Sequence, residues 1–284
     1  MNIIVKNNIC LKDVVEHGIQ QLHLANINNA KKEIEWFLKE KLSVSTSQLI
    51  FNQETTLSKS QIKIFNKFID RRVNGEPFQY IIQKATFYGY DFIVNNNTLI
   101  PRPETELIID VAKKFKPHDK ALDIGTGSGN IAITLAKKKI VKFVDAIDIS
   151  NHALAVAREN KLLHQTNNIS FYNVDIFKKK LHKKYDLIVS NPPYVTKKEY
   201  LKLEKHIQLY EPKIALTDYG TGIKFYKYFS DNLSQILKPT GRIILEIGQE
   251  NAKEEINDLF LSNNYKCSWH KDLNGNWRVL EACQ

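Results

Sequence analysis

The sequence has little cysteine and no long apolar run. Its 284 residues include three cysteines, Cys10, Cys267 and Cys283, whose spacing matches no metal-ligand pattern. An odd number of cysteines also argues against a disulfide framework. No apolar run approaches the roughly 18 residues that a membrane-spanning helix needs, and the first ten residues lack the basic-then-apolar pattern of a signal peptide. We therefore expect a cytoplasmic protein without a membrane or metal partner.

Acidic residues are in the minority. Asp and Glu total 31 against 41 Lys and Arg, which gives a formal net charge of +10. Such a charge invites a polyanionic partner. A lysine bias spread over the whole chain explains it as well, because the densest runs, 137–139 and 178–180, fall at the end of an expected helix and in an expected loop. We favour this second explanation, so no nucleic-acid partner is required.

The first 75 residues carry no catalytic constellation, since His17 and His23 have no evident acidic or thiol partner. Apolar residues recur there at the spacing of amphipathic helices. Ser58 followed by Gln61 matches a helix capping box. We expect residues 1–75 to form a small helical bundle that serves substrate recognition. The apolar positions behind this prediction are Leu11, Val14, Val15, Ile19, Ile34, Phe37, Leu38, Leu42, Ile62, Ile64, Phe65, Phe68 and Ile69.

A turn-rich segment follows the helical region. Gly75-Glu76-Pro77 breaks the helical pattern, and the short apolar stretches 86–88 and 91–94 lie on either side of Gly89-Tyr90. Such stretches around a glycine-containing turn indicate a β-hairpin. We expect residues 76–99 to form a hairpin linker between two domains.

From residue 100 onward, strands and helices alternate. This pattern is typical of a doubly wound α/β domain with a mostly parallel sheet. Asn274-Gly275 is a strong hairpin signal, so we expect two antiparallel strands at the end. The expected strands are 121–124, 141–147, 169–173, 185–189, 242–247, 266–270 and 277–280, the expected helices 130–138, 151–164, 222–237 and 249–261, and a polar loop is expected before Asp218.

A glycine-rich turn, Asp123-Ile-Gly-Thr-Gly-Ser-Gly129, joins the first of these strands to its helix. Glycines there permit φ above zero and a close approach of the backbone to a ligand. The spacing differs from that of dinucleotide sites, and no Lys-Ser/Thr pair completes a phosphate-binding loop. Asp148 ends the second strand, where a carboxylate can bind ribose hydroxyls. Asp175 follows the third strand, at the position expected for the rim of an adenine pocket.

The fourth strand stops at a stiff corner, Asn191-Pro192-Pro193-Tyr194. Neither proline can donate a ladder hydrogen bond, and each fixes its φ near −65°. Asn191 precedes a proline and is therefore restricted to extended backbone. The corner presents an amide side chain, backbone carbonyls and an aromatic ring at the carboxyl end of a strand, where open α/β sheets bind ligands. The four residues alone leave a purely structural strand exit equally open.

The glycine turn, the two acids and Asn-Pro-Pro-Tyr occur in one consistent order. This set resembles the class I S-adenosylmethionine-dependent methyltransferases, whose Rossmann-like seven-stranded sheet agrees with the expected strands. The resemblance implies S-adenosylmethionine as cofactor and S-adenosylhomocysteine as product. The residues expected to bind the cofactor are Asp123, Gly125, Thr126, Gly127, Ser128, Gly129, Asp148, Asp175, Ile176 and Asn191.

In this superfamily Asn-Pro-Pro-Tyr resembles the mark of methylation on a planar nitrogen, either a base amino group or a glutamine amide. Such a nitrogen is a poor nucleophile because its lone pair is delocalised. The Asn191 side-chain oxygen and the Pro192 carbonyl can hold its two N–H groups and favour the positive charge that develops there. Tyr194 can lie on the face of the planar group. The expected catalytic residues are Asn191, Pro192 and Tyr194, and the expected substrate contacts are Asn191, Pro192, Pro193 and Tyr194.

The proton can leave after the nitrogen becomes cationic, so this chemistry needs no strong general base. That accounts for the lack of a His–Asp pair.

Five further stretches resemble one family, the release factor glutamine methyltransferases, and the similarity covers essentially the whole chain. It implies N5-methylation of the glutamine in the Gly-Gly-Gln loop of class 1 peptide-chain release factors, and hence a part in translation termination. Nothing in the sequence suggests an obligate assembly, so a monomer is expected. The stretches are Ile-Pro-Arg-Pro-Glu-Thr-Glu (100–106), Asp-Ile-Gly-Thr-Gly-Ser-Gly-Asn-Ile-Ala (123–132), Glu-Pro-x-x-Ala-Leu (211–216), Leu-Glu-Ile-Gly-Gln (245–249) and Asp-Leu-x-Gly-x-x-Arg-Val (272–279).

Three alternatives use the same corner or fold. A DNA or RNA methyltransferase acting on an adenine or guanine amino group would want a base-recognition domain, for which the segment between Tyr194 and Gly220 is too short. A sister family methylates a glutamine of ribosomal protein uL3, but residues 102–106 here are of the release-factor type. An inactive adaptor conflicts with the intact glycine turn and Asp148.

Two details stay open at the level of sequence. Members of the family often carry an aromatic residue after the third-strand acid, whereas this chain has Ile176 followed by Phe177, and either side chain can line the adenine pocket. Arg102, Glu104 and Glu106 can contact the cofactor, the substrate or only the fold.

Overall fold

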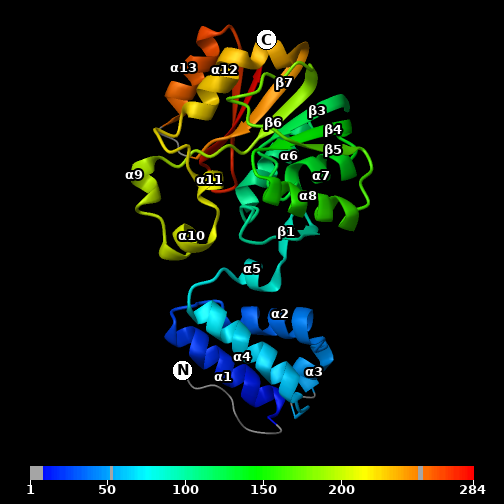
Figure 1. Ribbon diagram of the computed structural model, residues 1–284, viewed down its shortest axis with the longest axis vertical. Helices are drawn as coiled ribbons and strands as arrows, with labels where there is room; N and C mark the ends of the chain where they lie inside the picture. The colour runs from blue at the N-terminus through cyan, green and yellow to red at the C-terminus, as the bar shows by residue number, and fades with distance from the viewer. Residues whose placement is uncertain (1–8, 52–53, 249–251) are drawn as a thin grey trace. The chain divides into compact units, whose positions relative to one another are not determined.

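The computed structural model describes residues 9–51, 54–248 and 252–284. By contacts, the chain divides into two compact units, residues 1–84 and 85–284 (Figure 1). No helix in the described ranges is both long enough and apolar enough to cross a membrane.

The first unit is helical, as predicted. Ser58 and Gln61 form the predicted capping box at the start of the fourth helix. Phe37 stacks on Phe68 with 4.0 Å between ring centroids. A Cβ on Gly18 would lie 2.7 Å from the ring of Phe65, so glycine lets the first helix pack closely. The helices are α1 (Leu11–Leu24), α2 (Ala30–Leu42), α3 (Thr46–Phe51), α4 (Lys59–Val73) and α5 (Phe78–Ile82).

This unit extends beyond residue 75, where the sequence placed the end of the helical domain. Helix α5 contributes Phe78, Ile81 and Ile82 to the same apolar core as the preceding helices. The compact unit therefore ends at Lys84.

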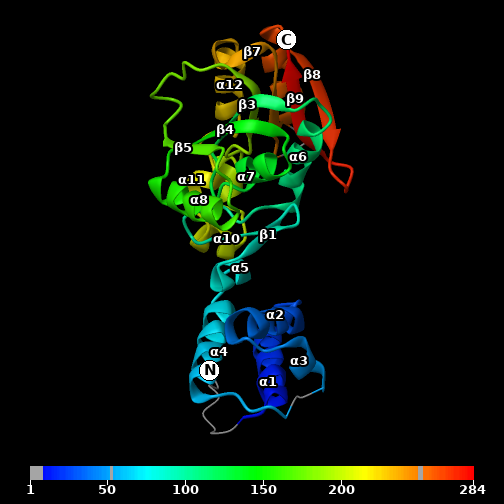
Figure 2. The same cartoon turned by 90° about the vertical axis from the view of Figure 1, so that its right-hand side faces the viewer.

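The second unit is built on a seven-stranded sheet with the order β5-β4-β3-β6-β7-β9-β8. β9 pairs antiparallel with β7 and β8, and the other pairs are parallel. The predicted parallel sheet with an antiparallel C-terminal hairpin is thus confirmed, and β8 and β9 lie at one edge (Figure 2). The strands are β3 (His118–Ile124), β4 (Val141–Asp148), β5 (Ile169–Asn173), β6 (Tyr185–Ser190), β7 (Leu237–Glu246), β8 (Lys266–Lys271) and β9 (Trp277–Cys283).

Helices cover both faces of this sheet (Figure 1). Alternate strand residues face opposite sides, so Ala121 packs with α6 and α7 while Leu122 packs with α12 and α13. Helix α8 lies beside α7 and β5. The helices are α6 (Glu106–Ala112), preceded by the 3-10 turn η1 (Pro103–Thr105), α7 (Asn130–Lys137), α8 (Asn151–Leu163), α12 (Lys224–Ile236) and α13 (Lys253–Ser262).

The predicted hairpin is present as β1 (Ala85–Phe87) and β2 (Tyr90–Phe92), which pair antiparallel. Phe87 and Phe92 are fully buried in the core on one face of the large sheet. The hairpin is therefore part of the second unit.

The predicted polar loop before Asp218 was wrong. This segment contains α9 (Lys197–Tyr200), α10 (Lys205–Tyr210) and α11 (Lys213–Leu216). Thr196 and Glu199 form a capping box at the start of α9, a signal present in the sequence. The expected helix at 249–261 begins at Lys253 in the structure, and its first predicted residues, 249–251, lie outside the described ranges.

Candidate active site

The site lies where the order of the strands reverses. The chain runs from β3 outward through β4 and β5, then returns to β6 on the other side of β3. Ligands bind beyond the carboxyl ends of the strands at such a point. Ile124 of β3 pairs with Ser190 of β6, whose hydroxyl donates to the Ile124 carbonyl at 2.7 Å. The glycine turn and the Asn-Pro-Pro-Tyr corner, which follow these two residues, are thus neighbours.

A cavity of about 400 Å³ opens at this point. It brings together most of the predicted site residues, and its lining also includes Arg102, Thr105 and Asp218. The predicted residues that line it are Gly125, Thr126, Gly127, Ser128, Asp148, Asp175, Ile176, Asn191 and Pro193. Four predicted residues, Asp123, Gly129, Pro192 and Tyr194, are not among its lining.

The glycine turn holds the Asp148 carboxylate against the cavity. Gly125 and Gly127 have φ of +73° and +54°, which L side chains rarely adopt. In that conformation the Gly127 amide donates to Asp148 Oδ2 at 2.9 Å, and the Ser150 amide donates to Oδ1 at 2.9 Å. Burial raises the pKa of Asp148, while these amide bonds favour its charged form. The carboxylate is therefore fixed in place by the turn that it faces.

Asp123 and Gly129 support the turn from behind. The Thr126 hydroxyl donates to Asp123 Oδ2 at 2.6 Å, and Asp123 is fully buried. Burial raises the pKa of Asp123 to about 7, and the hydrogen bond from Thr126 acts in the opposite direction, toward a lower pKa. A Cβ on Gly129 would lie 3.3 Å from Ala157 Cβ, so glycine lets α7 approach α8 closely. These two residues position the site without lining it.

Both side chains that follow the third-strand acid line the cavity. The Phe177 amide donates to Asp175 Oδ1 at 3.0 Å. Ile176 is buried, whereas Phe177 is 40% exposed and packs edge-on against Phe225, with Lys224 Nζ 4.3 Å from its ring centre. Ile176 thus forms the inner wall and Phe177 the outer rim.

Asn191 lies on the cavity wall beside Thr105. Its Nδ2 donates to Thr105 Oγ1 at 3.1 Å, although the two residues are 86 positions apart in the sequence. Thr105 is buried at the end of η1, within the stretch 100–106 that resembles the family. The resemblance contained this residue, but the residue pattern gave it no role.

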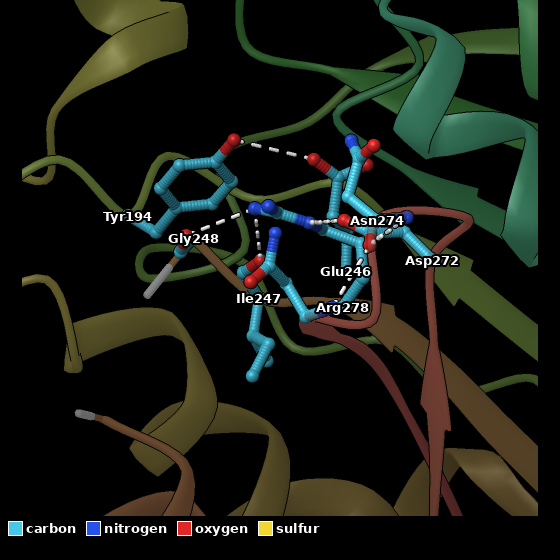
Figure 3. A network of polar contacts seen from close by, with 8 residues as sticks. Tyr194, Glu246, Ile247, Gly248, Asp272, Asn274 and Arg278 are labelled. Carbon is cyan, nitrogen blue, oxygen red and sulfur yellow. Dashed lines mark hydrogen bonds and ion pairs between the residues drawn. The ribbon is translucent and has the colours of Figure 1, made fainter. Parts of the chain in front are cut away.

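Tyr194, the last residue of the corner, belongs to a network of polar contacts with Glu246 and Arg278 (Figure 3). Its hydroxyl donates to Glu246 Oε1 at 3.2 Å, and its ring packs on Gly248. Arg278 Nη1 donates to the carbonyl of Gly248 at 2.9 Å, and its Nε donates to Asp272 Oδ2 at 3.3 Å. Glu246 and Gly248 of one family stretch thus join Tyr194 to Arg278 of the last such stretch.

Arg102 joins two other family stretches. Its Nη2 donates to Glu211, a buried carboxylate in the stretch 211–216. Glu106 accepts from the Tyr88 amide at 2.7 Å and so binds the hairpin to α6. Arg102 lines the cavity, whereas Glu106 is not among its lining and bonds the backbone of the hairpin.

Two further site residues were missed by the residue pattern. Asp218 accepts hydrogen bonds from the amides of Gly220, Gly222 and Lys224 at 2.7, 2.9 and 3.2 Å, which shapes the loop before α12. Glu246 is fully buried, and burial raises its pKa to about 7 while Thr105 and Arg278 favour the charged form. Its sequence signal is a single acid at the end of an apolar strand.

The sheet, the glycine turn and the cavity at the switch point define a class I methyltransferase. Residues 103–218 match the methyltransferase small domain, and residues 13–82 match the PrmC N-terminal domain. A solved methyltransferase from Pyrococcus furiosus shares the fold, with a TM-score of 0.53, 21% identity, and coverage of 69% of this chain and 89% of that one.

Relatives with curated names give the family. The release factor glutamine methyltransferase of Fusobacterium nucleatum is 35% identical over 277 residues, 95% of this chain and 78% of the relative. That of Bacillus subtilis is 35% identical over 273 residues, 92% of this chain and 93% of the relative. The chain belongs to the release factor glutamine methyltransferase family.

Proposed function

We propose that this protein transfers a methyl group from S-adenosylmethionine to the side-chain amide nitrogen of the glutamine in the Gly-Gly-Gln loop of class 1 release factors. The observation that carries the proposal is the position of Asn191, whose amide lies on the cavity wall with its nitrogen already bonded to Thr105. Its oxygen then serves as the acceptor for a planar N–H group. We expect the protein to act as a monomer in the cytoplasm.

The cavity fits the cofactor. Its turn carries glycines with positive φ, which let the backbone approach a ligand, and Asp148 presents a fixed carboxylate suited to ribose hydroxyls. Asp175, Ile176 and Phe177 supply one acidic and two apolar walls for adenine. When bound, S-adenosylmethionine supplies an electrophilic methyl group on its sulfonium.

The corner prepares the acceptor nitrogen. The Asn191 oxygen and the Pro192 carbonyl accept the two N–H groups, which orients the nitrogen and favours the positive charge that grows on it. The proton leaves after the charge has formed, so no side chain of the corner needs to act as a strong base. Tyr194 packs on Gly248 and bonds Glu246, so we assign it the part of holding the corner in place, and its contact with the substrate stays a prediction.

The release factor is favoured over a nucleic acid by the relatives and by the domain content. Two relatives at 35% identity are named release factor glutamine methyltransferases, and they align with nearly all of this chain. The match to the PrmC N-terminal domain covers residues 13–82 in the helical unit. We assign substrate recognition to that unit.

The test is transfer of label from radioactive S-adenosylmethionine. We expect label in a class 1 release factor and none when the glutamine of its Gly-Gly-Gln loop is replaced by alanine. Parallel reactions contain ribosomal protein uL3, DNA and ribosomal RNA at the same concentration. Label in any of these with none in the release factor would overturn the proposal.

A further inference from the structure

Asn160, a fully buried residue of α8, joins the glycine turn to the segment that follows the hairpin. Its Nδ2 donates to the carbonyl of Ser128 in the turn at 2.9 Å. The same nitrogen donates to the carbonyl of Ile93, the first residue after β2, at 2.9 Å. Its Oδ1 accepts from the Ile93 amide at 2.7 Å. One side chain thus connects three segments that are distant in the sequence.

The partners of this side chain match the chemistry of an amide. An asparagine amide has two N–H donors and one acceptor oxygen. At position 160 both donors meet carbonyl oxygens and the oxygen meets an N–H group, so the amide is fully bonded. A reversed amide would set its oxygen against two carbonyl oxygens. Serine offers one donor and an ionised aspartate none, so neither can replace these three bonds.

The bond to Ser128 fixes a peptide unit of the cavity wall. Ser128 lines the cavity. The C=O of Ser128 and the N–H of Gly129 belong to one planar peptide unit. Asn160 binds that C=O, and the Gly129 amide donates to the carbonyl of Thr126 at 2.8 Å. Because the plane is held at both ends, its rotation is blocked, and the turn keeps one orientation toward the cavity.

The bonds to Ile93 fix a second part of the wall. Residues 97–99, a few positions after Ile93, also line the cavity. They belong to a compact turn, in which the Thr98 amide donates to the carbonyl of Asn95 at 3.0 Å. Asn160 itself is not among the residues that line the cavity. It therefore acts through the backbone of two walls and sets their position relative to each other.

We propose that Asn160 is a positioning residue for cofactor binding, which holds the glycine turn and residues 97–99 in the arrangement that the cofactor requires. The inference rests on the proposed binding of S-adenosylmethionine in this cavity, and it involves no release factor. Without Asn160, the Ser128–Gly129 peptide is free to rotate. The cofactor must then order the turn as it binds, which weakens its apparent affinity.

The experiment compares Asn160→Ala with His164→Ala. His164 lies four residues later, at the end of α8, with its Nε2 2.9 Å from the carbonyl oxygen of Asp91 and its ring against Phe92. Its loss loosens the same contact between α8 and the hairpin but removes no bond to the glycine turn. By calorimetry, we expect Asn160→Ala to raise the Kd for S-adenosylhomocysteine at least about tenfold, and His164→Ala to keep it within about twofold of wild type.

Asn160→Ser is measured beside these variants. It keeps one donor and leaves room for a water molecule at the freed carbonyls, so it carries the same test if Asn160→Ala does not fold. Its Kd is expected between those of wild type and Asn160→Ala.

A second measurement uses the protein without any ligand. Gly129 is the only glycine in the sequence that follows a serine. In protein labelled with 13C on serine carbonyls and 15N on glycine, the one directly bonded labelled pair is therefore the Ser128–Gly129 peptide. We expect its signals to shift in Asn160→Ala and in Asn160→Ser, and to stay in place in His164→Ala.

Three results would overturn the positioning role. The first is an unchanged Kd in Asn160→Ala and Asn160→Ser. The second is an equal rise of the Kd in His164→Ala, which would mean that only the contact with the hairpin matters. The third is an unshifted Ser128–Gly129 signal in the Asn160 variants. The proposed function fails separately: if wild type binds S-adenosylhomocysteine but labels no release factor, the substrate is wrong and the role of Asn160 stands.

Discussion

Tyr194 lies directly against Gly248. A Cβ built on Gly248 would fall 2.1 Å from Cδ2 and 2.5 Å from Cε2 of the tyrosine ring, distances that no real Cβ contact shows. Position 248 therefore has room only for glycine. The reason is steric, since the φ of Gly248 is not in the left-handed region. Because Tyr194 ends the Asn-Pro-Pro-Tyr corner, the position of the ring is linked to the position of Asn191.

We predict that Gly248→Ala displaces the Tyr194 ring and lowers kcat at least about tenfold, with a loss of stability of about 1–3 kcal/mol from overpacking. Gly220→Ala is the control, because its Cβ would meet Asp218 Oδ1 at an ordinary 3.6 Å. Urea unfolding and steady-state kinetics measure both effects. In a Tyr194→Ala background the extra cost of Gly248→Ala should disappear. A cost that persists there would place the clash elsewhere.

Arg278 supports the same glycine from the C-terminal hairpin. Its Nη1 donates to the carbonyls of Ile247 and Gly248 at 3.3 and 2.9 Å, and Asp272 holds its Nε. We predict that Arg278→Ala lowers kcat by about tenfold while the KM for S-adenosylmethionine changes little, since the corner moves and the glycine turn does not.

Arg242 provides the comparison for that variant. It pairs with Glu281 and also joins β7 to β9, but it lies earlier in β7, away from the carboxyl end. Arg242→Ala should destabilise the sheet to a similar extent and leave kcat unchanged. Equal losses of kcat in the two variants would show that the arginines act only through the stability of the sheet.

The sequence predicted the local elements and the order of the motifs well, and the contacts between distant residues poorly. Ser58–Gln61 and Asn274-Gly275 are signals within a few residues, and both gave the expected cap and hairpin. Strand β7 began earlier than predicted, at Leu237, because pairing with Tyr185 keeps Pro239 and Gly241 in a strand that their own propensity disfavours.

The same contrast between local signals and long-range contacts holds for the site residues. The glycine turn and Asp148 were predicted because strand-to-helix turns of a parallel sheet share one edge. The bond of Asn191 to Thr105 spans 86 positions and depends on how η1 packs beside β6, which no local pattern encodes. The packing of the Tyr194 ring on Gly248 is likewise a contact between distant stretches that the motif does not encode, and the contact of the ring with the substrate stays a prediction.

The buried Glu246 carboxyl makes stability depend on pH in an unusual direction. Burial raises its pKa from near 4.5 to about 7. Between these values the folded state binds more protons than the unfolded state, so the free energy of unfolding falls as the pH rises and reaches its lower level above about pH 7. We predict that Glu246→Gln removes this part of the pH dependence, on the order of 3 kcal/mol at about 1.4 kcal/mol per pKa unit.

Urea unfolding of wild type and Glu246→Gln at about pH 5 and pH 8 measures most of the effect, since these values span most of the interval between the unfolded and the folded pKa. The stability of wild type relative to the variant should be greater at the lower pH. Asp119→Asn is the control, because the Asp119 side chain is 64% exposed and pairs with Lys142 at the surface. A relative stability that stays constant or increases with pH would contradict a raised pKa at Glu246.

Asn191 is expected to serve the acceptor and not to be needed for cofactor affinity. We predict that Asn191→Ala abolishes measurable transfer to a release factor, since the acceptor nitrogen loses one of its two hydrogen-bond acceptors and its orientation. The Kd for S-adenosylhomocysteine, measured by calorimetry, should stay within about threefold of wild type. Asp148→Asn provides the opposite case, because the Asp148 carboxylate lines the cavity. This variant should raise the Kd for S-adenosylhomocysteine more than it lowers kcat. Loss of affinity in Asn191→Ala in step with activity would assign Asn191 to the cofactor.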